Sequence, residues 1–156
     1  MTKLKNFAEV LLKFKNQPGL TGTFAEHIYK NFAFIEAHET LLKHDNQLLF
    51  TLKIPSHLCN VMGNLHGGAV ATILDAATTL AILKNDSEGR KSVSIDMSMS
   101  FLNPAKKDDL LYVQASCLKV GKAVSFSKCK IYDESTRKII AFGSHTKAML
   151  KEPFDI

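Results

Sequence analysis

Cysteine is scarce in this 156-residue chain, and its three copies, Cys59, Cys117 and Cys129, include no C-x-x-C pair. An odd number of unpaired cysteines favours free thiols and a reducing compartment over a disulfide framework. His57, Cys59 and His66 are the nearest candidates for metal ligands, but their spacing fits no common zinc pattern. The sequence therefore predicts free thiols and no metal site.

Long hydrophobic runs and basic tracts are also missing. The longest apolar run, residues 67–83, is shorter than a bilayer span and contains Asp75 and three threonines. The net charge of +5 comes mainly from dispersed lysines, without the arginine-rich or aromatic-interleaved tracts that favour nucleic acid. No secretory hydrophobic region is visible near residue 1. These absences predict no stable membrane insertion, no nucleic-acid partner and a cytoplasmic protein, with a mitochondrial location as the alternative.

The order of apolar patterns predicts an α+β fold. A basic amphipathic helix is expected over residues 3–15, and a second short helix or irregular lid over residues 24–34. A long helix begins at Gly67 and is apolar nearly all round, which is the pattern of a buried helix. Strands are expected over residues 35–43, 47–54, 92–102, 110–118, 123–132 and 138–150. We thus expect an antiparallel sheet of about six strands wrapped around the helix, in a domain spanning residues 35–150 with a helical extension (1–34) and a tail (151–156).

Residues 92–101 alternate without exception between serine or aspartate and an apolar side chain. This period of two predicts a strand with one core face and one polar face. One sheet has only one helix-facing side, and its edge strands need covering. We therefore expect at least a homodimer.

The segment from Asn60 to Leu83 carries the strongest functional pattern. Gly67 and Gly68 stand where a loop turns into the long helix, so their backbone N–H groups can point at a ligand oxygen. Asp75 is the one charge within the apolar run, and a buried carboxylate is costly unless it has a partner. The alternatives are that Asp75 belongs to a solvated polar stripe with neighbouring threonines, and that Asn60 only caps a turn.

The chain resembles the hotdog-fold acyl-coenzyme A thioesterases of the phenylacetate-pathway and mammalian thioesterase superfamily member two type. The motifs that carry the resemblance are Asn60-x-x-Gly63-x-x-His66-Gly67-Gly68 followed by Asp75, Val93-Ser94-x-Asp96-Met97, Pro104-Ala105-Lys106 and His145-Thr146-Lys147. The resemblance covers residues 35–150. It implies hydrolysis of acyl-CoA thioesters by dimers that commonly pair into tetramers, with no metal or organic cofactor.

The resemblance also implies roles for individual residues. The Gly67 N–H and the Asn60 side-chain amide would polarise the thioester carbonyl, while Asp75 would deprotonate a water or attack directly. Ser94 would help to hold that water, and His66 would shape the turn and support the helix start. Coenzyme A would lie near Phe101, Asn103, Pro104, Lys106, Lys119, Gly121, Lys122 and Lys147, although a solvated surface role is the plain alternative for each of these lysines.

The spacing of the motif raises a geometric problem. His66 and Asp75 are nine positions apart, which places them about 180° apart around a helix axis. A site built across a two-fold interface, with Asp75 from one copy and Asn60 and Gly67 from the other, resolves the separation.

Two other functions are alternatives to a thioesterase. A non-catalytic acyl-CoA sensor or scaffold of the same fold would bind the ester without hydrolysing it. A hotdog hydratase would require a histidine paired with an aspartate or glutamate as acid and base, and the placement of His66 and Asp75 does not resemble that group.

Overall fold

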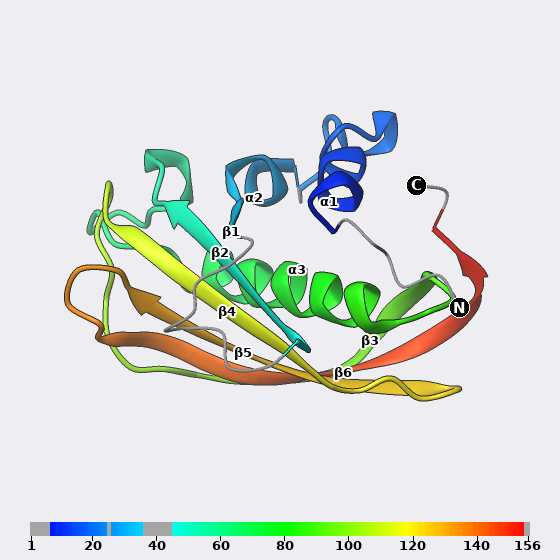
Figure 1. Cartoon of the computed structure of the whole chain (residues 1–156). Coiled ribbons are helices and arrows are strands. Elements are labelled where there is room, and N and C mark those ends of the chain that lie inside the picture. Colours follow the sequence, from blue (N-terminus) through cyan, green and yellow to red (C-terminus); the bar gives the residue numbers. More distant parts are fainter. Residues whose placement is uncertain (1–6, 25, 36–44, 155–156) are drawn as a thin grey trace.

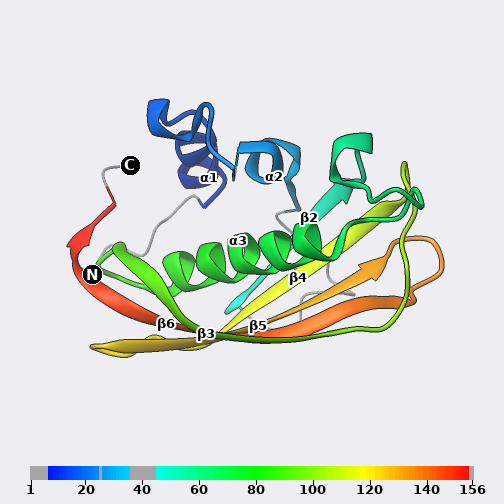
Figure 2. The ribbon, with the colours of Figure 1, turned by 180° about the vertical axis from the view of Figure 1, so that it is seen from behind.

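The computed structural model describes residues 7–24, 26–35 and 45–154. One antiparallel sheet curls around the central helix α3 (Gly67–Asn85), and α1 (Phe7–Lys15) and α2 (Glu26–Asn31) lie on the side of α3 away from the sheet (Figures 1 and 2). This is the hotdog arrangement that the sequence predicted. The second short helix expected over residues 24–34 is α2, and a 3-10 turn, η1 (Pro18–Leu20), separates it from α1.

The sheet has six strands in the order β1-β2-β4-β5-β6-β3, and every neighbouring pair is antiparallel. Their bounds are β1 (Ala33–Ile35), β2 (Gln47–Lys53), β3 (Arg90–Phe101), β4 (Leu110–Lys119), β5 (Val124–Asp133) and β6 (Ile139–Pro153). Within the described residues, the strand expected over 35–43 appears only as β1, because residues 36–44 lie outside them. Although β3 and β4 follow one another along the chain, they are not neighbours in the sheet, since β3 pairs with β6 at the far edge and β4 pairs with β2.

Helix α3 is buried because apolar side chains cover it from two sides. The sheet contributes residues such as Phe50, Val113 and Ile131, none of which is exposed, while Phe32, the residue after α2, packs from the other side. Phe32 stacks on Phe50 with ring centroids 4.9 Å apart. Among the described helices only α3 is long and apolar enough to cross a bilayer, and 61% of its most apolar window is buried, as in the core helix of a globular domain.

Strand β3 departs from the simple alternation expected of it. A register shift pairs Ser94 with Lys147 but Asp96 with Thr146, so Ile95 is an extra residue, a β-bulge. Directly opposed residues share one face of a sheet, so Ser94 lies on the α3 side, as does Met97, which opposes His145. Val93, one residue before Ser94, lies on the outer side. The prediction of one continuous apolar face was therefore wrong.

The apolar residues of β3 are also largely uncovered. Val93, Ile95 and Phe101 are 49%, 57% and 58% exposed, and Met97 is 37% exposed. Within the described sheet, β3 is an edge strand with a ladder to β6 alone. A long edge strand that carries exposed apolar side chains is a template for pairing with another chain.

An ion pair braces the end of α3 against the β4–β5 turn. The Arg90 guanidinium donates to both carboxylate oxygens of Asp86, whose pKa is held below its usual value by these bonds despite burial. The same guanidinium donates to the backbone oxygens of Gly121, at 3.2 Å, and Lys122, at 3.0 Å. The turn is thus fixed relative to α3.

The close approach of β6 to α3 requires a glycine at position 143. A Cβ atom there would lie 2.4 Å from the Ser98 carbonyl oxygen and 2.8 Å from Leu74 Cδ1. We expect Gly143→Ala to destabilise the fold by about 1–3 kcal/mol through overpacking, which corresponds to a fall in Tm of roughly 3 to 10 °C. Gly19→Ala, where a Cβ would meet nothing within 4 Å, is the control and should leave Tm unchanged in the same thermal melt. Equal Tm values for the two variants would contradict this packing argument.

Candidate active site

The first part of the site is the N-terminus of α3. His66 is the N-cap residue, and its Nδ1 accepts a hydrogen bond of 2.9 Å from the Gly68 backbone N–H. Gly67 is the first helical residue and is exposed, so its N–H belongs to the group that has no partner within a helix. The end of the helix dipole adds partial positive charge here. This position therefore suits a ligand oxygen on which negative charge develops.

Asn60 lies in the tight turn that leads to this helix start. Its side-chain oxygen accepts from the backbone N–H groups of Met62, at 2.9 Å, and Asn64, at 3.2 Å. Because the oxygen is engaged in the turn, the NH₂ group is the part of this side chain that can donate to a ligand oxygen. In the structure Asn60 thus stabilises the turn, and its NH₂ group remains available to donate to a ligand oxygen.

A hollow of about 320 Å³ opens beside this turn. It brings Asn60 and Gly67 together with Phe101, Asn103 and Pro104, three of the residues expected to contact coenzyme A. Met62, Leu102 and Ile140 add apolar lining. A polar donor pair at the rim of a partly apolar hollow is the usual composition of a small-molecule site.

Asp75 lies near the middle of α3, away from this hollow. Its side chain is 47% exposed, so the expectation of a fully buried carboxylate was wrong. Oδ1 lies 3.3 Å from the Thr79 hydroxyl and 3.3 Å from Lys147 Nζ. The carboxylate is therefore partnered on the side that faces the sheet.

Ser94 is connected to α3 through His145, to which the sequence analysis gave no role beyond its place in a motif. The His145 ring is almost fully buried, with Nδ1 2.7 Å from Thr78 Oγ1 and Nε2 2.9 Å from Ser94 Oγ. The Thr78 hydroxyl hydrogen is directed at the Leu74 carbonyl, 2.7 Å away, so Thr78 Oγ1 accepts from His145 Nδ1–H. In the neutral imidazole Nε2 then accepts from the Ser94 hydroxyl, and the Ser94 oxygen can accept a hydrogen bond from a water.

The environment of His145 favours this neutral form. Burial is the main cause that lowers the pKa of His145, and the positive charge of Lys147 lowers it further. The carboxylates of Asp75 and Asp96 act in the opposite direction without reversing the shift. Asp75 Oδ1 lies 3.6 Å from His145 Nδ1.

Lys147 does not occupy the position expected of a surface lysine at a strand end. It lies within β6 with only 4% of the residue exposed, and its ammonium donates to Asp75 Oδ1 and to Thr79 Oγ1, the latter at 2.7 Å. Strand alternation places Lys147 on the α3 side with His145 and Gly143, a signal that the sequence contained. The motif His145-Thr146-Lys147 was noticed as part of the resemblance, but the pairing across 72 residues with Asp75 was not.

The remaining expected coenzyme A contacts fall into separate places in one protomer. Lys106 is exposed and lies two residues after Pro104. By contrast, Lys119 ends β4, and Gly121 and Lys122 lie in the β4–β5 turn beside the other end of α3. A helix of 19 residues is about 28 Å long. Within one protomer the two groups are therefore too far apart to surround the same part of a ligand.

The two halves of the proposed catalytic set are also separated. Asp75 is eight residues beyond Gly67 in the same helix, which places the two backbones about 12 Å apart along the axis. No group of three or more His, Cys, Asp or Glu residues in the described part of the chain could hold a metal ion.

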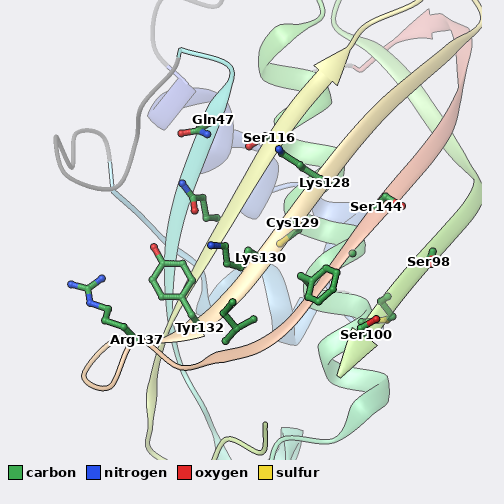
Figure 3. Close-up of a pocket in the computed structure, with 15 residues that line it drawn as sticks. Gln47, Ser98, Ser100, Ser116, Lys128, Cys129, Lys130, Tyr132, Arg137 and Ser144 are labelled. Atoms are coloured by element: carbon green, nitrogen blue, oxygen red, sulfur yellow. The ribbon is translucent and has the colours of Figure 1, made fainter. Parts of the chain in front are cut away.

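A larger hollow, of about 840 Å³, lies on the sheet face opposite α3 (Figure 3). Lys128, Lys130 and Tyr132 line it from β5, Gln47 and Ser116 from the neighbouring strands, and Arg137 from the β5–β6 turn. None of the expected catalytic residues lies there. We therefore assign the candidate site to the α3 side.

Comparisons with known proteins point to one family. Residues 62–140 match the family model described as the thioesterase superfamily. Mouse acyl-coenzyme A thioesterase 13 is 35% identical over 101 residues, which cover 65% of this chain and 71% of the mouse protein. The solved structure of zebrafish thioesterase superfamily member 2 superimposes with a TM-score of 0.78 at 25% identity, over 96% of this chain and 100% of that one. A hypothetical thioesterase from Streptococcus pneumoniae, solved with coenzyme A, shares the fold with a TM-score of 0.68 at 20% identity, over 82% of this chain and 92% of that one.

The lowered pKa of His145 predicts a specific dependence of stability on pH. Below about pH 6.5, the ordinary histidine value, the unfolded chain binds a proton that the folded chain resists, so stability falls as the pH falls. We expect the wild type to lose more unfolding free energy between about pH 7 and pH 5 than His145→Gln does. His57→Gln, at an exposed position, should keep the wild-type pH dependence. Urea titrations at both pH values measure the difference, and parallel losses in all three proteins would contradict the prediction.

Proposed function

Because the chain belongs to the thioesterase superfamily, we propose that it hydrolyses acyl-CoA thioesters to a free acid and coenzyme A. The observation that supports the proposal most is the exposed N–H of Gly67 at the capped start of α3, in a hollow shared with Asn60 and Phe101. A helix N-terminus stabilises the oxyanion that forms when a thioester carbonyl is attacked. The water is the co-substrate, and the proposed reaction needs neither a metal ion nor an organic cofactor.

In the proposed mechanism one group of residues binds the carbonyl oxygen and another activates the water. The Gly67 N–H, assisted by the Asn60 amide, holds the carbonyl oxygen, while Asp75 removes a proton from a water that Ser94 also binds. The water oxygen bonds to the carbonyl carbon, and the tetrahedral intermediate collapses with cleavage of the C–S bond. The coenzyme A thiolate leaves and takes up a proton. Direct attack by Asp75, through an anhydride that water then hydrolyses, is the alternative route.

We further propose that each site is completed by a second copy of the chain. The 12 Å between Asp75 and Gly67 along α3 is too long for both to act on one carbonyl, so a two-fold partner would supply one of them. The exposed apolar edge of β3 supports a partner at this side of the sheet. Such a partner would bring the second group of lysines, at the β4–β5 turn, toward the phosphates of a substrate held at Gly67. A dimer of dimers stays a further prediction.

A non-catalytic acyl-CoA sensor of the same fold is the competing proposal. It would retain the hollow and the positive charge but would not need a carboxylate with two polar partners. The contacts of Asp75 with Thr79 and Lys147 favour the enzyme. A binding protein would give calorimetric binding of acyl-CoA with no release of thiol.

The first test replaces the proposed base with an isostere. We expect Asp75→Asn to lower kcat for acyl-CoA hydrolysis by about 10²- to 10⁴-fold, because the amide cannot accept the proton from water. Binding of the substrate should remain close to the wild-type value. The measurement is release of free thiol from a panel of short, long and aryl acyl-CoAs, with calorimetry for affinity. Asp109→Asn, in the loop before β4, is the control, and an unchanged kcat in Asp75→Asn would exclude the proposed role.

The second test asks whether the two halves of the site come from different subunits. Gly67→Pro removes the proposed oxyanion donor, and proline is well tolerated at the first position of a helix. The preceding His66, with φ −66° and ψ 136°, already has the backbone conformation that precedes proline. We expect Gly67→Pro and Asp75→Asn each to be nearly inactive alone, whereas Gly67→Ala, which keeps the N–H, remains active.

Mixing the two inactive variants distinguishes the arrangements. In a shared site, a mixed dimer has one doubly defective site and one intact site. Random reassembly at equal amounts should then restore about a quarter of wild-type activity, since half of the dimers are mixed and each has one working site of two. If Asp75 and Gly67 acted within one protomer, mixing would restore nothing.

A further inference from the structure

Lys147 is an unusual residue because its charged end is inside the protein. The residue is 4% exposed, and burial lowers the pKa of its ammonium group while the charge of Asp75 acts to raise it. Lysine is rarely buried to this extent without a compensating partner. Its two partners are both on α3, Asp75 Oδ1 at 3.3 Å and Thr79 Oγ1 at 2.7 Å.

The contacts of Asp75 are concentrated on one of its two oxygens. Thr79 Oγ1, Lys147 Nζ and His145 Nδ1 lie 3.3, 3.3 and 3.6 Å from Oδ1. All the side-chain contacts that the structure gives this carboxylate among the described residues fall on Oδ1. Because the side chain is still 47% exposed, the carboxylate presents its other oxygen, Oδ2, outward.

We propose that Lys147 is a positioning residue that fixes Oδ1 of Asp75, so that Oδ2 is the oxygen that reacts. The inference rests on the proposed function. The oxygen that is not held by Lys147 and Thr79 is the one left to take a proton from water or to attack a carbonyl. A carboxylate with one oxygen held by an ammonium and a hydroxyl also has a restricted rotamer, which is what catalytic positioning requires.

Among the described groups around Asp75, Lys147 is the one that can hold its Oδ1 with a positive charge. On α3 the neighbour is Thr79, which is uncharged. On β6 they are Lys147 and His145, and burial together with the Lys147 charge holds His145 neutral. On α2 Tyr29 has a pKa raised by burial and by the Asp75 charge, so it stays protonated. Asp96 of β3 acts on His145, whose pKa it raises without reversing the overall lowering. Lys147 is therefore the cation in contact with Asp75 within the described residues.

This role differs from the coenzyme A contact that the sequence suggested for Lys147. A residue that binds a phosphate contributes to substrate affinity, so its loss raises KM. A residue that positions the catalytic carboxylate affects the chemical step, so its loss lowers kcat. The two roles can be separated in one set of measurements.

The test compares Lys147→Met with Lys138→Met, at an exposed lysine next to the start of β6. In Lys147→Met we expect kcat to fall by about tenfold or more, with KM for acyl-CoA within about twofold of the wild type. Lys147→Arg, which keeps a charged donor for Oδ1, should recover most of the wild-type kcat. Lys138→Met should change neither kcat nor KM.

The possible results separate the roles. A raised KM with unchanged kcat would overturn the proposal in favour of a phosphate contact. A kcat that is equally low in Lys147→Met and Lys147→Arg, with Tm lowered in both, would reduce Lys147 to a structural role. A wild-type protein that releases no thiol from any acyl-CoA would instead refute the proposed function.

A measurement of stability checks the ion pair without any activity. Asp75→Asn leaves the buried ammonium without its carboxylate, so Tm should fall, and adding Lys147→Met should raise Tm again. The double variant Asp75→Asn with Lys138→Met should not regain the Tm that Asp75→Asn loses. A Lys147→Met change that lowers Tm equally in both backgrounds would show that the ammonium is not held by Asp75.

Discussion

The fold depends on burying one helix that has almost no polar side. Helix α3 carries eleven buried residues, and no single sheet can cover all of them. The curled sheet covers one side, and α1, α2 and the residue after α2 cover another with Phe7, Leu11, Ile28 and Phe32. What is left is the side at Asp75, whose side chain is half-exposed and whose polar partners among the described residues come from β6 and from the next turn of the helix itself. The charge is thus placed where the covering is incomplete, which is also where a ligand can reach it.

The second constraint is the unfinished edge of the sheet. Strands β4, β5 and β6 follow one another with short turns and satisfy each other's backbone groups, whereas β3 is added beside the last of them. Its exposed apolar side chains make it unlike the protected edge strands of monomeric proteins. Helix α3 is incompletely covered and the edge strand β3 is unpaired on one side. A second copy of the chain would cover both.

Much of this architecture could be predicted from the sequence, because it depends on local patterns. The helix at Gly67 and the strands from β4 to β6 follow from periodicity and turn residues, and the oxyanion half of the site follows from Gly67 at a helix start. The other half could not be predicted in detail. The contacts of Ser94 with His145, and of Lys147 with Asp75, join residues more than fifty positions apart, and they depend on which face of β6 packs on α3. The prediction from the alternation of β3 was wrong for the same reason. A bulge changes the face on which a residue lies, and the order of side chains in the sequence does not reveal it.

The bulge also affects which insertions and deletions β3 can accept. Ile95 takes up one residue of strand length, so the pairing of Val93 and Ser94 with β6 is independent of the pairing of Met97 and Met99. Deleting Ile95 would remove the bulge and leave both parts of the ladder in register, with Ser94 still opposite Lys147 on the α3 side, next to His145. A deletion in the regular part of the ladder would instead turn the side chains on one side of the deletion to the other face of the sheet. At the bulge the strand can therefore change its length by one residue without moving this serine from the site, whereas elsewhere in β3 it cannot.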